Sequence, residues 1–439
     1  MTSLLRNRPL MLMGAAEVIN SLGSWITAMA LYSILIFQEG GGMAISSAIF
    51  FASLGPTLLL SPFAGWLCDR YDRRTLMIAS RLLQGAATAG LIFTNNLPLI
   101  YTLLVASAVF GLVMGPARTT AMPDVVAPAE LTQANAFMQQ VTGTIKILAP
   151  ALAGGLLTVM DPHLAISLDV VSFLLSAAVL LLLPPLPAKG APVLATGKPV
   201  KEKGLLRDSL ALLQRHIPGL LLLLPLNVLM ALVIMAFDVA MAVYVRDILQ
   251  ATIAFKGFIG FAVGGGMIAG SSAFLFLKGE RNLWRDVMVG FLLVTALSVA
   301  MALGEVAGPA AARLILLGAC VLGGVGMGVI NVQAGVLFIK LCPQGMLGRI
   351  GGLFDSVSTT GRLVGLLLTP ILVPHVVSFG GYFGTASVLL LAAIAFTAVA
   401  LQRRGATAEA SARVASQAGA SRIQAAEPNE RHEVVVHGA

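Results

Sequence analysis

The sequence predicts an all-α membrane protein with twelve transmembrane helices in two six-helix pseudo-repeats. The chain is 57% hydrophobic and only 11% charged, with a mean hydropathy of +0.91, whereas about a quarter of the residues of a soluble domain are charged. Such a composition requires a bilayer, because a soluble core cannot bury that much apolar surface. Long apolar runs recur along the chain, and a sequence pattern of its first half is repeated in its second half.

A helix that crosses the hydrocarbon core needs roughly 20 apolar residues. The predicted spans are 11–37, 43–67, 75–94, 98–118, 133–158, 163–183, 218–244, 254–277, 286–304, 312–339, 350–373 and 379–401. Ala28-Met29-Ala30 resembles a signal-peptide cleavage site. Because the first apolar run continues to Phe37, we interpret it as an uncleaved first helix.

The longest polar break falls near mid-chain and divides the spans evenly. Residues 1–183 form a predicted N-terminal bundle, 184–217 a Pro-rich cytosolic linker, 218–401 a C-terminal bundle and 402–439 a disordered cytosolic tail. Six plus six spans with a long central loop are typical of a transporter. We expect a monomer.

Basic residues set the predicted orientation. With both termini in the cytosol, only Arg246, Lys256 and Arg313 of the 28 Lys and Arg residues fall on the outside. The positive-inside rule therefore predicts cytosolic termini in a bacterial inner membrane. The charge of +8 then serves topology, and we expect no nucleic-acid partner.

The two halves share a weak repeat. Residues 114–150 align with 327–370: each segment opens on Met-Gly, and each later has Thr-Gly, a basic residue and Pro. The basic residues are Lys146 and Arg362, on the fifth and eleventh spans. The order and the offset of about half the chain indicate duplication.

The loop between the second and third spans gathers charge in "GWLCDRYDRRTL" (65–76). A topological stop explains the arginines but neither Gly65 nor Asp69. The stretch resembles the loop signature of the major facilitator superfamily, in Gly65, Asp69, Arg70, Arg73 and Arg74. The resemblance implies that these residues gate alternating access between the two faces of the membrane.

The resemblance to the superfamily extends over residues 10–400. Four segments resemble one particular branch of it. "PDVVAPAELTQANA" (123–136), "APALAGGLL" (149–157), "LDVVSFLLSA" (168–177) and "GMLGRIGGL" (345–353) are similar to macrolide-efflux and enterobactin-exporter proteins. The family's antiporter signature corresponds to Ala149, Pro150, Ala153 and Gly154, where two alanines replace glycines. This implies export. The arginine that the family carries midway along its fourth helix is absent.

Charges inside the bilayer are informative because each costs about 2.5–3.5 kcal/mol at its centre. Glu17, Lys146, Asp238 and Arg362 are the candidates for coupling or substrate binding. We predict that Lys146 pairs with Glu17 or, failing that, with Asp238. Such a pair could be static or could serve a proton or the substrate, and the sequence leaves both open.

Further polar residues mark a predicted cavity. Asn20 and Trp25 lie on the first span, and Asn331 and Gln333 lie on the tenth. Asp169 and Asp355 are nearer to helix ends, so we assign them structural roles.

The predicted function is secondary active export of an amphipathic small molecule, such as a macrolide-like drug or a siderophore, by proton antiport. No Gly-x-x-x-x-Gly-Lys-Ser/Thr loop for ATP is present. Lysophospholipid transport is the alternative within the same fold. A metal cargo or site, a cofactor, a membrane enzyme and a receptor are all disfavoured, because no ligand cluster, catalytic motif or soluble module is visible.

Overall fold

The computed structural model describes residues 6–127, 130–187, 221–276, 282–341, 347–373 and 375–401. Their regular structure is helical, and no strand occurs within these ranges. The first half of the chain contains α2 (Arg8–Tyr32), the π-helix η1 (Ser33–Gln38), α3 (Met43–Arg70), α4 (Arg73–Ile92), α5 (Leu97–Gly111), α6 (Met114–Val125), α7 (Leu131–Leu156) and α8 (Pro162–Leu180). The second half contains α11 (Leu223–Asp247), α12 (Ile253–Phe276), α13 (Leu283–Ala307), α14 (Pro309–Leu341), α15 (Leu347–Leu372) and the helix Phe379–Leu401.

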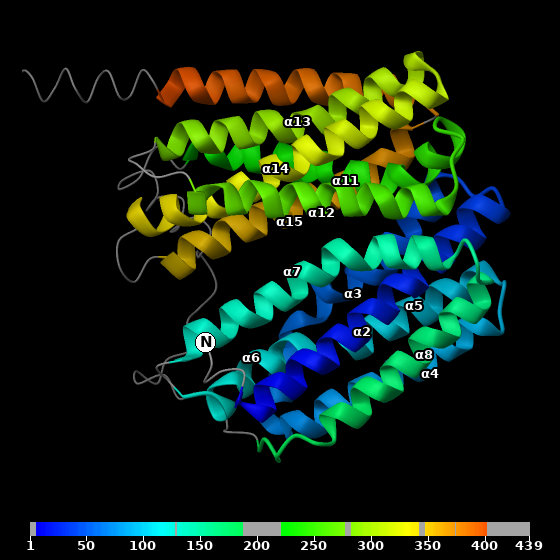
Figure 1. Ribbon diagram of the computed structural model, residues 1–439, viewed down its shortest axis with the longest axis vertical. Coiled ribbons are helices and arrows are strands. Elements are labelled where there is room, and N and C mark those ends of the chain that lie inside the picture. The colour runs from blue at the N-terminus through cyan, green and yellow to red at the C-terminus, as the bar shows by residue number, and fades with distance from the viewer. Residues whose placement is uncertain are drawn as a thin grey trace, which may run out of the picture.

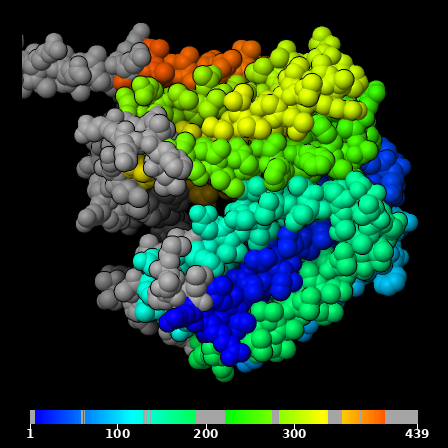
Figure 2. Space-filling model, viewed as in Figure 1, coloured from blue at the N-terminus to red at the C-terminus, as the bar shows by residue number. Residues whose placement is uncertain are grey.

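The helices form two groups that follow the two halves of the chain (Figure 1). In the first half α2 packs on α7 and α8, and α4 packs on α5 and α8. In the second half α14 packs on α12 and α13, and α11 packs on α15. The halves contact each other through α7 with α12 and through α3 with α11 and α15. Figure 2 shows α7 and α12 side by side along this seam.

Short polar residues begin many of the helices. The side chains of Asn7, Asp72, Asn96, Asp161 and Asn282 each accept a hydrogen bond from a backbone N–H of the first turn. Each such cap contributes about 1 kcal/mol because it satisfies an otherwise unpaired donor. The turns between spans are therefore defined locally, by the sequence itself.

Nine helices within the described ranges are long and apolar enough to cross a membrane. The helices α3, α7 and α15 occupy the positions of the other three predicted spans, with 28, 26 and 26 residues. Large apolar side chains such as Leu152, Leu174 and Leu314 remain exposed, as expected where lipid replaces water. The chain is thus a helical membrane protein, while the count of twelve stays a prediction.

Two basic residues at the ends of predicted spans lie within helices. Arg118, the last residue of the predicted span 98–118, lies inside one membrane-spanning segment, Leu97–Val125, that α5 and α6 make together. Lys256 was expected on the outside, and it lies in the first turn of α12, where it lines an internal cavity. The helix that contains Arg118 thus continues past the last strongly apolar residue.

The two halves are joined at one end of the molecule. We call the end where α2 begins the N-terminal face, and the end where α3 begins the opposite face. Among described residues, several hydrogen bonds between the halves lie towards the opposite face. Ser46 Oγ donates to Val239 O at 2.6 Å, and Arg246 donates to Gly41 O at 2.9 Å and to Ile36 O. The structure is therefore held together at the opposite face.

The π-helix η1 contributes to this closure. The backbone N–H of Glu39 reaches back to Ile34 O at 2.9 Å, the wide spacing of a π-turn. Ile36 O accepts from the Arg246 guanidinium of the second half. The irregular end of the first span thus accepts a hydrogen bond from α11.

The predicted linker 184–217 and tail 402–439 lie outside the described residues, except for 184–187. The domain boundaries stay predictions.

Candidate functional site

A cavity of about 640 Å³ lies between the two halves. Its walls come from α2, α3 and α7 on one side and from α11, α12, α13 and α14 on the other. A volume of about 300–1,000 Å³ is usual for sites that bind small organic molecules. The cavity is thus large enough for a drug-sized ligand, and both halves contribute to it.

Most of the cavity wall is apolar and adaptable. Trp25 and Phe50 line it from the first half, and Phe237, Met241 and Met267 line it from the second. Aromatic rings offer large flat apolar surfaces, and methionine side chains adjust to ligands of different shape. Such walls favour a ligand with a bulky apolar part.

Three charged residues line the same cavity: Lys146 on α7, Asp238 on α11 and Lys256 on α12. Asp238 and Lys256 belong to the same half and attract each other electrostatically. The Lys256 ammonium also lies 4.1 Å from the centroid of the Tyr32 ring and 3.8 Å from Met29 Sδ, both of the first half. Lys256 therefore has an anion and an aromatic face as neighbours.

Lys146 is different. Its side chain is exposed to the cavity, and no described carboxylate lies within ion-pair distance of it. The predicted pairing with Glu17 is wrong, because Glu17 is bound by two other cations. Asp238 shares the cavity with Lys146 but has Lys256 as its electrostatic partner.

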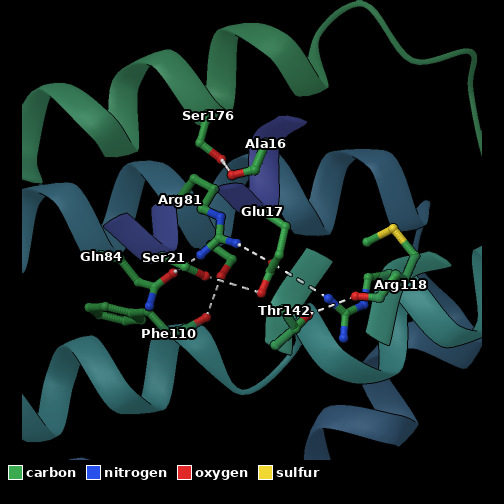
Figure 3. A network of polar contacts seen from close by, with 11 residues as sticks. Ala16, Glu17, Ser21, Arg81, Gln84, Phe110, Arg118, Thr142 and Ser176 are labelled. Atoms are coloured by element: carbon green, nitrogen blue, oxygen red, sulfur yellow. Dashed lines mark hydrogen bonds and ion pairs between the residues drawn. The ribbon is translucent and has the colours of Figure 1, made fainter. Parts of the chain in front are cut away.

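Glu17 belongs to a separate network inside the first half (Figure 3). One oxygen of its carboxylate, Oε2, lies 3.4 Å from Arg81 on α4 and 3.5 Å from Arg118 on α6. Ser21 donates to the other oxygen at 3.4 Å, and Arg81 also donates to Gln84 at 3.2 Å. One carboxylate thus links three helices, which compensates for burying Arg81 at 4% exposure.

Asp169 is satisfied in the same half. Thr27 donates to its carboxylate at 2.6 Å and Ser172 at 2.9 Å, and it is only 1% exposed. It lies next to Gly23, where a Cβ would meet Asp169 Oδ1 at 2.3 Å. These contacts lock α2 against α8.

The antiporter-motif residues form the seam between the halves. A Cβ on Gly154 would lie 3.1 Å from Gly257 Cα, and one on Gly257 would lie 2.6 Å from Pro150 O. Ala149 and Ala153 are fully buried on the same helix. Small residues on both helices therefore let α7 and α12 approach backbone to backbone.

The loop-motif residues hold the N-terminal face of the first half. Arg73 forms an ion pair with Asp124 and donates to Thr120 O at 3.1 Å, while Arg74 donates to Leu181 O. Arg70 stacks its guanidinium 4.5 Å from the centroid of the Trp66 ring. Gly65 lies on α3 with open space around it.

Asp69 also lies on α3, but its side chain is outside the described part of the structure. Asp72, in the adjoining turn, accepts from the backbone N–H groups of Thr75 and Leu186, both at 2.8 Å. Burial acts to raise the pKa of this carboxyl. The hydrogen bonds and the Arg74 guanidinium outweigh that effect and hold its pKa below the ordinary value.

The remaining predicted residues divide between the cavity and other places. Asn20 and Trp25 line the cavity, as expected from their position on the first span. Gln333 is buried and donates to Asp286 at 3.0 Å, and Asn331 is exposed on α14. Neither contributes to the cavity wall.

Arg362 lies 3.7 Å from Asp355, about two helical turns earlier on α15, with both side chains largely exposed. It is not part of the cavity wall either. Sequence reasoning did not single out Lys256 or Arg118 as site residues. The signal was available, because each is a charged residue inside a predicted span, 254–277 or 98–118.

The family model that matches this chain is that of the Major Facilitator Superfamily, over residues 13–284. An uncharacterized MFS-type transporter of Bacillus subtilis, YfiS, is 24% identical over 83% of this chain and 86% of its own length. Macrolide efflux protein A of Streptococcus pyogenes is 24% identical over 81% of this chain and 87% of its own length. A solved bacterial homologue of the iron transporter ferroportin, in an inward-facing state, superposes with a TM-score of 0.65 at 18% identity, over 90% of this chain and 98% of that one. The chain therefore belongs to the Major Facilitator Superfamily and is a multi-pass membrane transporter.

Proposed function

We propose that this transporter exports an amphipathic small molecule by proton antiport, through alternating access of the cavity to the two membrane faces. The observation that carries the proposal is a mostly apolar cavity between two halves that are joined at one face. Similarity to a macrolide efflux protein supports the direction of transport.

Alternating access requires contacts that can break. At the opposite face the polar contacts are Ser46 with Val239, and Arg246 with Gly41 and Ile36. They lie beside apolar packing between the halves, in which Leu35 and Val243 belong to one core cluster. In the seam around Gly154 and Gly257, small residues bring the backbones of α7 and α12 together. Such a seam supports rocking of one half against the other around the cavity.

Glu17 is the proposed coupling residue. Its carboxylate joins Arg81 and Arg118, and Ser21, which donates to it, lines the cavity. A proton on Glu17 would remove the negative charge that pairs with Arg81 and Arg118. Binding and release of that proton would therefore change the packing next to the substrate.

The loop residues Gly65, Asp69, Arg70, Arg73 and Arg74 are the proposed gate at the N-terminal face. We further propose that this face is cytosolic, with both termini inside a bacterial inner membrane, because the basic residues concentrate there. We also propose that the transporter acts as a monomer, with a cavity lined by both halves of one chain.

The coupling is tested in inside-out vesicles from a strain without its own drug pumps. A labelled macrolide and a dansylated amphipathic acid serve as cargo. Uptake into the vesicles should follow an imposed proton gradient without ATP and should stop when an uncoupler dissipates that gradient. Uptake that needs ATP and ignores the gradient would contradict the proposal.

A further inference from the structure

The cavity contains more positive than negative charge. Two lysines and one aspartate line it. Asp238 and Lys256 act on each other within the second half, and Lys256 is further stabilised by the Tyr32 ring. Among the residues that the structure describes, no carboxylate lies within ion-pair distance of the Lys146 ammonium.

Contacts between α7 and α12 fix the position of the Lys146 backbone. The next residue, Ile147, lies where a Cβ on Gly264 would come within 2.4 Å of it, so α7 and α12 touch there. Lys146 also comes one turn before Pro150, which packs against Gly257 and Gly260. Its backbone is thus part of the seam, while its side chain is exposed to the cavity.

A second polar group faces the same space without a partner. Asn20 is 8% exposed, lines the cavity, and its Oδ1 accepts no hydrogen bond from the described residues. Buried amide oxygens are almost always hydrogen-bonded. A ligand that places a hydroxyl or N–H group there would satisfy this oxygen.

We propose that the substrate is an amphipathic molecule with one net negative charge, whose acidic group binds Lys146. Its apolar body lies against Trp25, Phe237 and Met241, and a hydroxyl or N–H group donates to Asn20. Asp238 offsets one of the two lysines in the cavity wall, so the surplus positive charge, at Lys146, sets the net charge that the cavity accepts. This inference rests on the proposed function, because it names the class of molecule carried through that cavity.

The opposite assignment would be a cationic drug bound by Asp238. Asp238 already has Lys256 as its neighbour, and an added cation would raise the positive charge of the cavity further. Like charges at short range in a partly desolvated site repel strongly. The structure therefore favours an anion over a cation.

The test is equilibrium binding to the full-length protein in lipid nanodiscs. Three probes share one apolar body: 8-(dansylamino)octanoate, its methyl ester, and N-(8-aminooctyl)dansylamide. Empty nanodiscs correct for partition into lipid. The variants are Lys146→Gln, Lys146→Arg and, as a matched loss of one positive charge, Arg285→Gln, whose side chain is 70% exposed at the start of α13.

The wild-type protein should bind the acid about tenfold more tightly than the ester, equivalent to about 1.4 kcal/mol, and should bind the amine least. Lys146→Gln should remove this preference by weakening the acid alone. Lys146→Arg and Arg285→Gln should keep it. A wild-type protein that binds the acid no better than the ester, including one that binds neither, overturns the proposal, as does an unchanged preference in Lys146→Gln.

The binding test and the transport test can fail independently of each other. Charge preference without gradient-driven uptake would contradict the exporter function and leave the Lys146 site standing. Gradient-driven uptake of a macrolide with no charge preference in binding would support the exporter function and contradict the Lys146 site.

Discussion

The two groups of charged side chains inside this transporter differ in how completely they are satisfied. In the first half, Glu17 connects to Arg81, Arg118 and Ser21, and most of that network is enclosed by helices. Between the halves, Lys146, Asp238 and Lys256 line a cavity, and only the last two act on each other. A closed network stabilises the fold, whereas an open group of charges remains available to a ligand. The distinction predicts different responses to mutation.

The largest effect on stability should come from Glu17→Ala. This change leaves Arg81, at 4% side-chain exposure, without its carboxylate. Removing one partner of a buried ion pair costs on the order of 3–5 kcal/mol. Thermal unfolding of purified protein measures the loss, and the double variant Glu17→Ala/Arg81→Ala should recover part of it. A double variant whose loss equals the sum of the Glu17→Ala and Arg81→Ala losses would show that the ion pair is not what stabilises α2 against α4.

Asp238→Asn should have a smaller effect on stability, under about 1 kcal/mol. The carboxylate faces the cavity rather than the packed interior, and Lys256 keeps its contact with the Tyr32 ring. The same unfolding assay compares it with Glu17→Ala. A loss of stability as large as that of Glu17→Ala would show that the charges of the cavity stabilise the fold as much as the Glu17 network does, which contradicts the distinction.

Lys146→Ala should change the free energy of unfolding very little. Its effect should add to that of a second substitution. Combined with Glu17→Ala, its effect on the free energy of unfolding should be the sum of the two within about 0.5 kcal/mol, because the two residues belong to separate networks. A double-mutant cycle on thermal unfolding measures this. A coupling above 1 kcal/mol would restore the pairing that the sequence had suggested.

The smallest effect concerns the loop at the N-terminal face. The folded-state pKa of Asp72 lies below its ordinary value of 3.8. The stability from its charge is therefore present above about pH 3.8 and is lost as pH falls through the folded pKa. Asp72→Asn keeps a good helix cap, so wild type and variant should differ slightly at pH 7 and converge towards pH 3. A difference that grows on acidification would contradict this sign.

Much of the fold could be predicted from local sequence, and the site only in part. Apolar runs located the helices because the bilayer requires a fixed length of apolar chain, and Asn and Asp caps defined the turns. Asn20, Trp25, Asn331 and Gln333 were predicted to mark a cavity, and the first two lie in its wall. Lys146 and Asp238, predicted to serve coupling or substrate binding, lie there as well.

Pairing of charges could not be predicted. Residue spacing shows which side chains share a face of one helix, but not how neighbouring helices are rotated against each other. Glu17 therefore turned towards Arg81 and Arg118 rather than towards Lys146. Arg118 and Lys256 were not chosen as site residues because each lies at the end of a predicted span rather than near its middle.

The central claim is that the two halves rock around the cavity and that the contacts of Arg246 hold the opposite face closed. Spin labels on Glu39→Cys and Thr252→Cys, both exposed at that face on different halves, report its opening through pulsed electron paramagnetic resonance, with the native cysteines replaced. The account predicts a short distance in the parent protein and a second, longer population that grows when Arg246→Ala removes the contacts to Ile36 and Gly41. A single short distance in both proteins would contradict it.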